Sequence, residues 1–130
     1  MSTQAQLRNR YARETVATAT PGQLLTMLYD RLARDLDAAE QGLGVRNIQA
    51  THTALIHAQD IVHELNATLD ISVWKEGEAL KRLYDWVIEQ LIEANMTKDV
   101  QFVHNARDVI EPIRRAWHQV ANSGVTGERH

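Results

Sequence analysis

The chain has 130 residues, which is enough for one domain with a single hydrophobic core. Hydrophobic residues make up 44% of it and charged residues 24%, the composition of an ordinary soluble domain, and a formal net charge of -3 gives no field that would attract nucleic acid. The absence of cysteine excludes disulfides and thiol chemistry, and no apolar run approaches the roughly 18 residues of a membrane-spanning helix. We therefore expect a cytoplasmic protein with no nucleic-acid partner and no membrane insertion.

One short motif occurs twice. Leu-Tyr-Asp stands at residues 28–30 and again at 83–85, and each copy is followed by a leucine eight residues after its first residue, at Leu36 and Leu91. Both copies lie in long stretches with an apolar residue every three or four positions. This pattern predicts two similar helical halves, each with a face that needs covering.

The first helix is predicted to begin at Thr20, whose hydroxyl can accept from the backbone N–H of Gln23. Pro21 fits the first turn because its missing N–H has no helical partner there. The glycines at positions 42 and 44 are expected to end this helix. Its predicted inward positions are Leu25, Leu28, Leu32, Leu36, Ala39 and Leu43.

Asn47 is the expected N-cap of the second helix, and residues 70–77 are its expected exit turn, with Gly77 already a candidate for the next helix. The second helix is predicted to bury Ile48, Thr51, Leu55, Ala58, Val62, Leu65 and Leu69.

The third helix is expected to end near residues 95–97, and the fourth near Asn122. Pro112 lies within the fourth stripe, so we expect a kink on the solvent side and not a termination. The inward positions of the third helix are predicted to be Leu80, Leu83, Val87, Leu91 and Ala94. Those of the fourth are Val103, Ala106, Ile110, Ile113, Trp117 and Val120.

Four such helices with short connections predict an all-α fold, an antiparallel up-down-up-down four-helix bundle. The bundle should span residues 20–122. An N-terminal arm at 1–19 and a polar C-terminal tail at 123–130 should flank it. In the arm, Tyr11 and Val16 are the large side chains that can cover part of an apolar groove, and the alternative is a mobile tail.

Catalytic and metal-binding patterns are nearly absent from the sequence. None of the six histidines forms the i, i+4 pair of a helical zinc site, and no Glu-x-x-His motif of a di-iron bundle occurs. The nearest relative is Asp60-x-x-His63, in which Asp60 should point outward if Val62 points inward. We therefore expect no metal, no cofactor and no enzymatic activity.

Apolar surface in excess of one core is the stronger signal. Tyr84, Ile88 and Ile92 recur at i, i+4 and i+8 and form a second stripe beside the main one, with Trp86 on the opposite flank. An alternative is that these residues only widen the core. For Tyr84 and Ile56 this explanation is as good as a role in binding. Exposed apolar grooves typically bind an amphipathic helix. The predicted partner-binding residues are Tyr11, Val16, Ile56, Ile61, Tyr84, Ile88, Leu91 and Ile92.

A series of short sequence blocks follows one order along the chain: Tyr11, residues 16–21, 23–30, 58–65, 69–77, 83–85, Leu91, 94–95 and 115–117. Together these blocks resemble the flagellin-specific export chaperones of the FliS type. Two positions depart from that pattern: Arg31 stands where the family usually has a glycine, and Pro112 is atypical.

The resemblance implies a helical bundle that binds the disordered C-terminal segment of flagellin in the cytosol. Such a chaperone would prevent premature polymerisation and deliver the subunit to a component of the flagellar type III export gate. Other flagellar regulators are further candidate partners. The competing hypothesis is a scaffold or adaptor whose spare face pairs with a second copy or with a regulatory protein.

Overall fold

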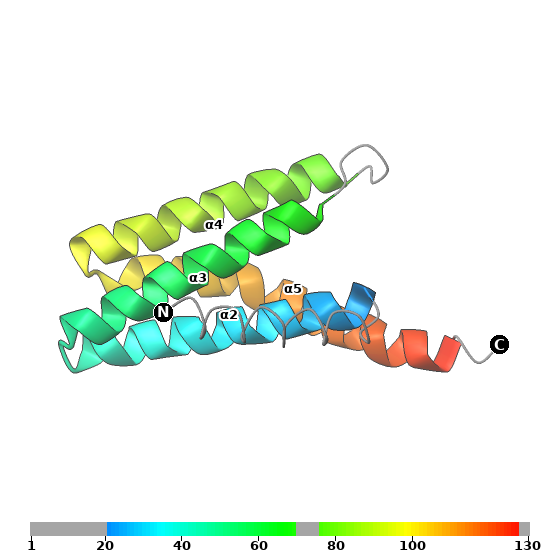
Figure 1. The fold of residues 1–130 in the computed structure, drawn as a ribbon, viewed down its shortest axis with the longest axis horizontal. Helices are drawn as coiled ribbons and strands as arrows, with labels where there is room; N and C mark the ends of the chain where they lie inside the picture. The colour runs from blue at the N-terminus through cyan, green and yellow to red at the C-terminus, as the bar shows by residue number, and fades with distance from the viewer. Residues whose placement is uncertain (1–20, 70–75, 128–130) are drawn as a thin grey trace, which may run out of the picture.

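The computed structural model describes residues 21–69 and 76–127, and these residues form an antiparallel bundle of four helices (Figure 1). The main contacts join each helix to its sequence neighbours, and α5 closes the ring against α2. The predicted up-down-up-down topology is confirmed. No helix in these two ranges is long and apolar enough to cross a membrane. The helices are α2 (Pro21–Gly44), α3 (Ile48–Thr68), α4 (Gly77–Thr97) and α5 (Val100–Gly127).

Most helix boundaries follow the sequence signals. The Asn47 side chain caps α3 by accepting from the backbone N–H of Ala50 at 3.0 Å, and Gly77 is the first residue of α4. The helix α5 passes through the exposed Pro112 and continues to Gly127, five residues beyond the end expected at Asn122. The predicted cap at Thr20 and the arm at 1–19 lie outside the described residues.

The helices α2 and α4 end where the sequence predicts, at Gly44 and at Thr97, but each end is followed by a non-glycine residue in the left-handed conformation. Arg46 follows α2 with a φ of 59°, and the N–H of Asn47 donates to the carbonyl of Gly42 at 2.8 Å. Lys98 caps α4 with a φ of 58° and donates its N–H to the carbonyl of Ala94. These are the positions of helix termini where glycine is the usual residue, because left-handed backbone costs other residues about 1 kcal/mol.

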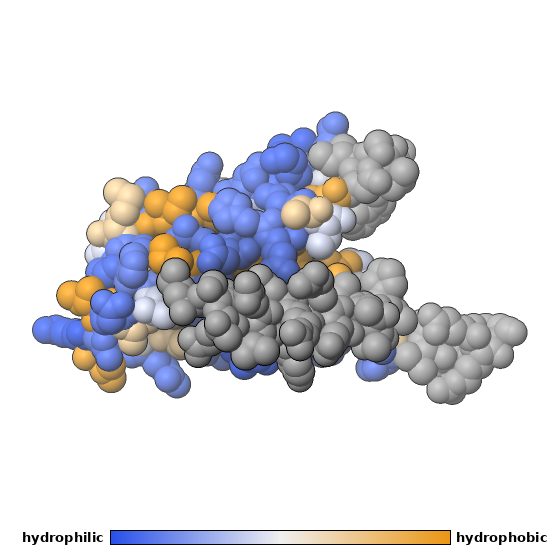
Figure 2. Space-filling view, viewed as in Figure 1, coloured by the Kyte–Doolittle hydropathy of each residue, from blue (hydrophilic) through white to orange (hydrophobic). Residues whose placement is uncertain are grey.

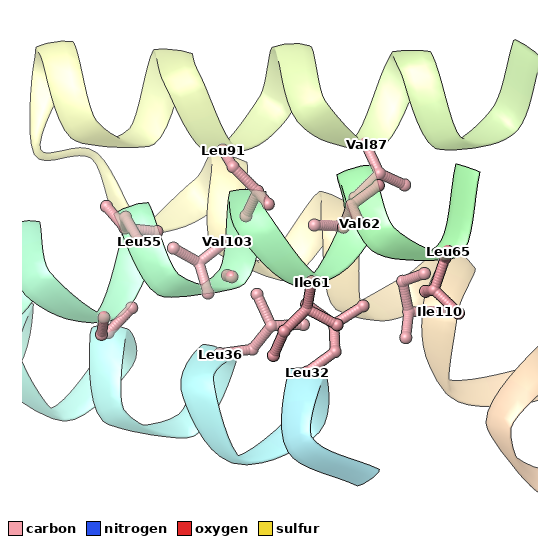
Figure 3. Packing of buried hydrophobic residues seen from close by; sticks show 14 of the residues in the cluster. Leu32, Leu36, Leu55, Ile61, Val62, Leu65, Val87, Leu91, Val103 and Ile110 are labelled. Atoms are coloured by element: carbon pink, nitrogen blue, oxygen red, sulfur yellow. The ribbon is translucent and has the colours of Figure 1, made fainter. Parts of the chain in front are cut away.

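The core lies along the middle of the bundle and receives side chains from all four helices (Figure 3). Two predicted core residues are instead exposed, Ile48 at 66% and Val120 at 54%. Ile48 is the first residue of α3, one turn before Thr51 takes the inward position against Gly42. Val120 lies in the last turns of α5, and Figure 1 shows the C-terminal end of that helix extending beyond α2. Both residues thus lie near a helix end, where the stripe is not fully covered.

The two tyrosines of the repeated Leu-Tyr-Asp motif meet inside the bundle. Their hydroxyl oxygens lie 2.5 Å apart, and Tyr29 and Tyr84 are 0% and 1% exposed. Burial raises the pKa of both phenols above the usual value, so both are protonated at neutral pH. The repeat thus places one tyrosine on α2 and one on α4 to form a polar link across the core.

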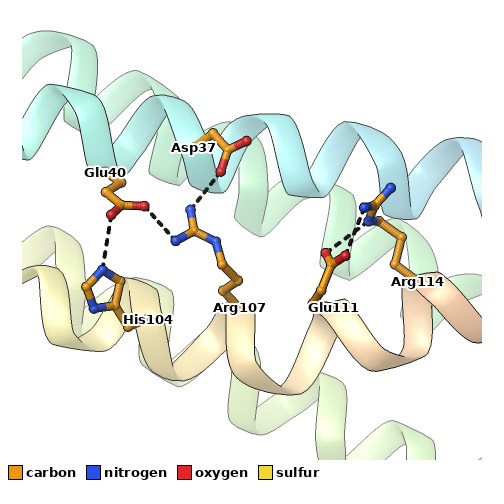
Figure 4. A network of polar contacts seen from close by, with 6 residues as sticks. All are labelled: Asp37, Glu40, His104, Arg107, Glu111 and Arg114. Atoms are coloured by element: carbon orange, nitrogen blue, oxygen red, sulfur yellow. Dashed lines mark hydrogen bonds and ion pairs between the residues drawn. The ribbon is translucent and has the colours of Figure 1, made fainter.

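Ion pairs join α2 to α5 on the outside of the bundle (Figure 4). The Arg107 guanidinium contacts Asp37 at 2.8 Å and Glu40 at 2.5 Å. Nearer the N-terminus of α2, Asp30 accepts from Arg114 and His118, each at 2.8 Å. We call these contacts the α2–α5 ion-pair seam.

Candidate partner-binding surfaces

The two helix pairs diverge at one end of the bundle. Figure 1 shows the α3 and α4 pair leaving the α2 and α5 pair toward the first residues of α2 and α4. A cavity of about 410 Å³ opens there between the pairs. Its lining is almost entirely apolar and comprises Leu24, Leu25, Thr68, Leu69, Leu80, Tyr84 and Trp117.

A second cavity, of about 450 Å³, adjoins the first. Leu80 and Trp117 line both, so the two cavities are neighbours at this end of the bundle, and we call them together the open-end cleft. The second cavity is lined by Glu76, Ala79, Leu80, Leu83, Ile113 and Trp117. Glu76 is the only charged residue among the described residues that line the cleft.

The walls of the cleft are half-buried leucines and a tryptophan that pack on the core from one side only. Leu24, Leu25, Leu80 and Trp117 each contact the buried cluster without entering it. Tyr84 forms part of the floor, and its hydroxyl is tied to that of Tyr29, which also receives a hydrogen bond from Trp117. The cleft therefore has a fixed polar link at its base and apolar walls that another apolar surface would fill.

The predicted second stripe on α4 is confirmed only in part. Ile92 is 41% exposed and Trp86 37% exposed, as expected, and Ile88 is half-buried. For Tyr84 the alternative holds, in which the residue widens the core, because it is 1% exposed and its hydroxyl meets that of Tyr29.

Two other predicted binding residues are also core residues. Ile61 and Leu91 are 2% and 0% exposed, since both point between helices (Figure 3). Ile56, at 39% exposed, remains accessible on α3. Tyr11 and Val16 lie outside the described residues.

The accessible isoleucines share one strip of surface along the line where α3 meets α4. The His52 ring lies 2.9 Å from the Asn95 side-chain nitrogen at one end of this strip. At the other end Asn66 donates to Asp85 at 3.1 Å. Helical spacing places Ile56 on the α3 face of His52 and Asn66, and places Ile88 and Ile92 on the α4 face of Asp85 and Asn95. We call Ile56, Ile88 and Ile92 the α3–α4 groove.

Neither surface has the groups of a reaction centre. Within the described ranges no three histidine, aspartate or glutamate side chains come together as a metal site would require. Asp60 and His63, the nearest sequence relative of a metal motif, are both exposed. The chemistry that these surfaces offer is the burial of apolar side chains of another molecule.

Sequence reasoning missed the open-end cleft. It assigned Leu25, Leu80, Ile113 and Trp117 to the core, because periodicity reports which face of a helix is apolar and not whether a second helix covers it. The sequence offered one indication that they are not fully covered, which is their position near the ends of the apolar stripes. A stripe that runs to the end of its helix is covered only if its neighbours stay parallel that far.

Comparison with known proteins gives a consistent set of relatives. Residues 3–124 match the family model described as "Flagellar protein FliS". The "Flagellar secretion chaperone FliS" of Bacillus subtilis is 30% identical over 113 residues, covering 87% of this chain and 84% of that protein. The Salmonella typhimurium protein of the same name is 34% identical over 110 residues, covering 82% and 80%.

A solved structure described as "Crystal structure of flagellar chaperone from bacteria" has the same fold. It superposes with a TM-score of 0.73 over 92% of this chain and 98% of its own, at 21% sequence identity. At that identity the comparison shows only that the two proteins share the fold of the helical bundle.

Proposed function

The chain belongs to the FliS family, a family of flagellar secretion chaperones and not of enzymes, and we propose that its cargo is the C-terminal segment of flagellin. In this proposal the protein acts in the cytosol. It keeps the bound segment from polymerising early and hands the subunit to the flagellar type III export gate.

The open-end cleft is the observation on which the proposal chiefly depends. Its two cavities, about 410 and 450 Å³, are lined by leucine, isoleucine and tryptophan side chains from α2, α4 and α5. An amphipathic helix can place apolar side chains at i, i+3, i+4 and i+7 into such a depression, with its polar face toward water. In this proposal the flagellin segment becomes an amphipathic helix of this kind on binding.

The α3–α4 groove offers a second contact for a longer segment. Ile56 and Ile92 are about two-fifths exposed, and the polar pairs at either end of the groove can direct a peptide along it. A disordered ligand that wraps two surfaces buries a large area but spends much of the gain on its own ordering. Such binding is firm enough to protect the segment and reversible enough to release it.

Calorimetric titration with a flagellin C-terminal peptide of several tens of residues tests the proposal. We expect a 1:1 complex with the unmodified protein. Leu80→Glu should weaken binding by tenfold or more, because a charge would enter both cavities of the cleft without a partner. Ile88→Asp combined with Ile92→Asp should weaken it further if the segment also follows the groove.

Ile48→Asp is the matched control, since it places a similar charge on an isoleucine that is 66% exposed at the far end of the bundle. It should bind the peptide at full strength, and circular dichroism should show native helix content for every variant. Full-strength binding by folded Leu80→Glu would exclude the cleft. If the unmodified protein binds no flagellin and light scattering shows self-association, the scaffold hypothesis is the better one.

A further inference from the structure

The end of the bundle opposite the cleft carries a second exposed apolar surface. Val45, Ile48 and Met96 are 75%, 66% and 74% exposed, the highest values among the large hydrophobic residues that the structure describes. Val45 lies in the turn between α2 and α3, Ile48 is the first residue of α3, and Met96 belongs to the last turn of α4. Figure 2 shows hydrophobic side chains at this end of the molecule. We call it the turn-end surface.

A cavity of about 310 Å³ lies within this surface. Two basic residues, Arg46 and Lys98, line this cavity, and no carboxylate is among the described residues that line it. Gly42 lies so close to Thr51 that a Cβ on it would come within 2.5 Å of the Thr51 hydroxyl oxygen, so the base of the cavity is tightly packed. The residues that line the cavity are Gly42, Leu43, Arg46, Ile48, Thr51 and Lys98.

Both cations occupy an unfavourable backbone conformation. Arg46 and Lys98, with φ values of 59° and 58°, are the only residues in the described ranges with a positive φ. Each is a helix-terminating position at which glycine would be free of strain. A non-glycine residue held in this region frequently marks a functional site, because the fold retains it against the cost.

The side chains of the two cations are differently placed for a ligand. Arg46 makes no side-chain hydrogen bond or ion pair with the described residues, and its guanidinium can offer two parallel donors to a carboxylate. The Lys98 ammonium donates to the Asn95 carbonyl at 2.5 Å and to its side-chain oxygen at 2.6 Å, which holds the charge in place. Asp99, the nearest acid in sequence, accepts from the N–H of Gln101 at the start of α5.

We propose that the turn-end surface binds a protein segment in which an apolar side chain is flanked by carboxylates. The apolar side chain enters the cavity beside Ile48, and the carboxylates pair with Arg46 and Lys98. The surface lies at the end of the bundle remote from the open-end cleft (Figure 1). One chaperone can therefore hold its cargo at one end while a second, acidic partner recognises the other.

The test uses two synthetic hexapeptides, one alternating glutamate with leucine and one with glutamine in place of every glutamate. Each is titrated into the ¹⁵N-labelled full chain, and amide shifts are followed by NMR. The glutamate peptide should move the amides of residues 42–51 and 97–99 and not those of the cleft. The glutamine peptide should bind at least tenfold more weakly.

Arg46→Gly and Lys98→Gly are the variants of choice, because glycine suits the backbone at both positions and the fold should be retained. Together they should remove glutamate-peptide binding while leaving flagellin-peptide binding unchanged. Equal binding of both peptides, unchanged binding by the double variant, or no shift at millimolar peptide would each overturn the proposal. None of these results depends on whether flagellin is the cargo, since the cargo is proposed to occupy the opposite end.

Discussion

The two ends of this bundle contain the same types of apolar residue but differ in how completely these residues are buried. At the turn end Gly42 lets α3 approach α2 closely, and Thr51 and Leu55 are fully buried. At the open end Leu25 and Leu80 come from stripes of the same kind, yet they remain half-buried around a cavity. The difference arises from helix divergence and not from side-chain chemistry. Apolar residues that would complete a core are left available to a partner.

The difference in packing between the two ends can be tested by making the same leucine-to-alanine substitution at each end. Leu55→Ala should lower the free energy of unfolding by about 2–5 kcal/mol, because Leu55 is 0% exposed and its loss leaves a cavity. Leu25→Ala should cost about 1 kcal/mol or less, since that side chain already faces open space. Urea denaturation of both variants measures the difference. Equal losses would mean that the open end is as tightly packed as the closed one.

A pair of glycines sharpens the comparison within the turn end itself. Gly42→Ala should destabilise by about 1–3 kcal/mol, because its Cβ would meet the backbone nitrogen of Thr51 at 3.1 Å as well as the hydroxyl at 2.5 Å. Gly44→Ala is the control, since nothing lies within 4 Å of the position of its Cβ. It should be neutral or stabilising by about 0.5 kcal/mol. Thermal midpoints that fall equally would contradict the close helix contact.

The fold was predictable from sequence because four apolar stripes, a cap at Asn47 and short turns all agree with one topology. The contacts of individual side chains were not predictable in the same way. Tyr84 stands three and seven residues before the buried Val87 and Leu91 and shares their inward face, but its hydroxyl contact with Tyr29, 55 residues away, has no signal in the period. Ile92, one residue after the buried Leu91, has no such partner and stays exposed.

The candidate surfaces were harder to predict for the same reason. The open-end cleft depends on where helices cease to be parallel, and the turn-end surface depends on two left-handed residues, Arg46 and Lys98. Neither feature produces a repeating pattern of apolar residues in the sequence. A glycine at position 46 or 98 would have indicated a left-handed residue after the helix. Arginine and lysine at these positions do not indicate that conformation.

Tyr84→Phe tests the polar link at the base of the cleft. The substitution leaves the buried Tyr29 hydroxyl with Trp117 as its remaining partner, so we expect a loss of about 1 kcal/mol in unfolding free energy. Adding Tyr29→Phe should cost less than the sum of the two single changes, because each single change already removes the hydrogen bond between the two hydroxyls. Chemical denaturation of the three variants gives the coupling. Strict additivity would show that the two hydroxyls do not interact.

The smallest expected effect concerns the α2–α5 ion-pair seam, which joins the two helices on the outside of the bundle. The Arg114 guanidinium lowers the pKa of Glu111, and the pKa of Asp30 is also lowered, because hydrogen bonds from His118 and Arg114 outweigh the effect of burial. Carboxylates whose pKa is lowered by folding stabilise the native state above their unfolded pKa and lose that contribution as the pH falls through the folded value. The seam should therefore contribute at pH 7 and fade below about pH 4.

Arg114→Gln isolates that contribution. At pH 7 it should lower the unfolding free energy by less than about 1 kcal/mol, since the groups are partly exposed and screened by solvent. The difference from the unmodified protein should shrink as the pH falls below about 4, because protonated carboxyls no longer distinguish the two side chains. A difference that stayed constant down to pH 2 would mean that Arg114 acts through packing of its stem. In that case the ion pair between Arg114 and Asp30 would contribute nothing to holding α5 against α2 near the open end.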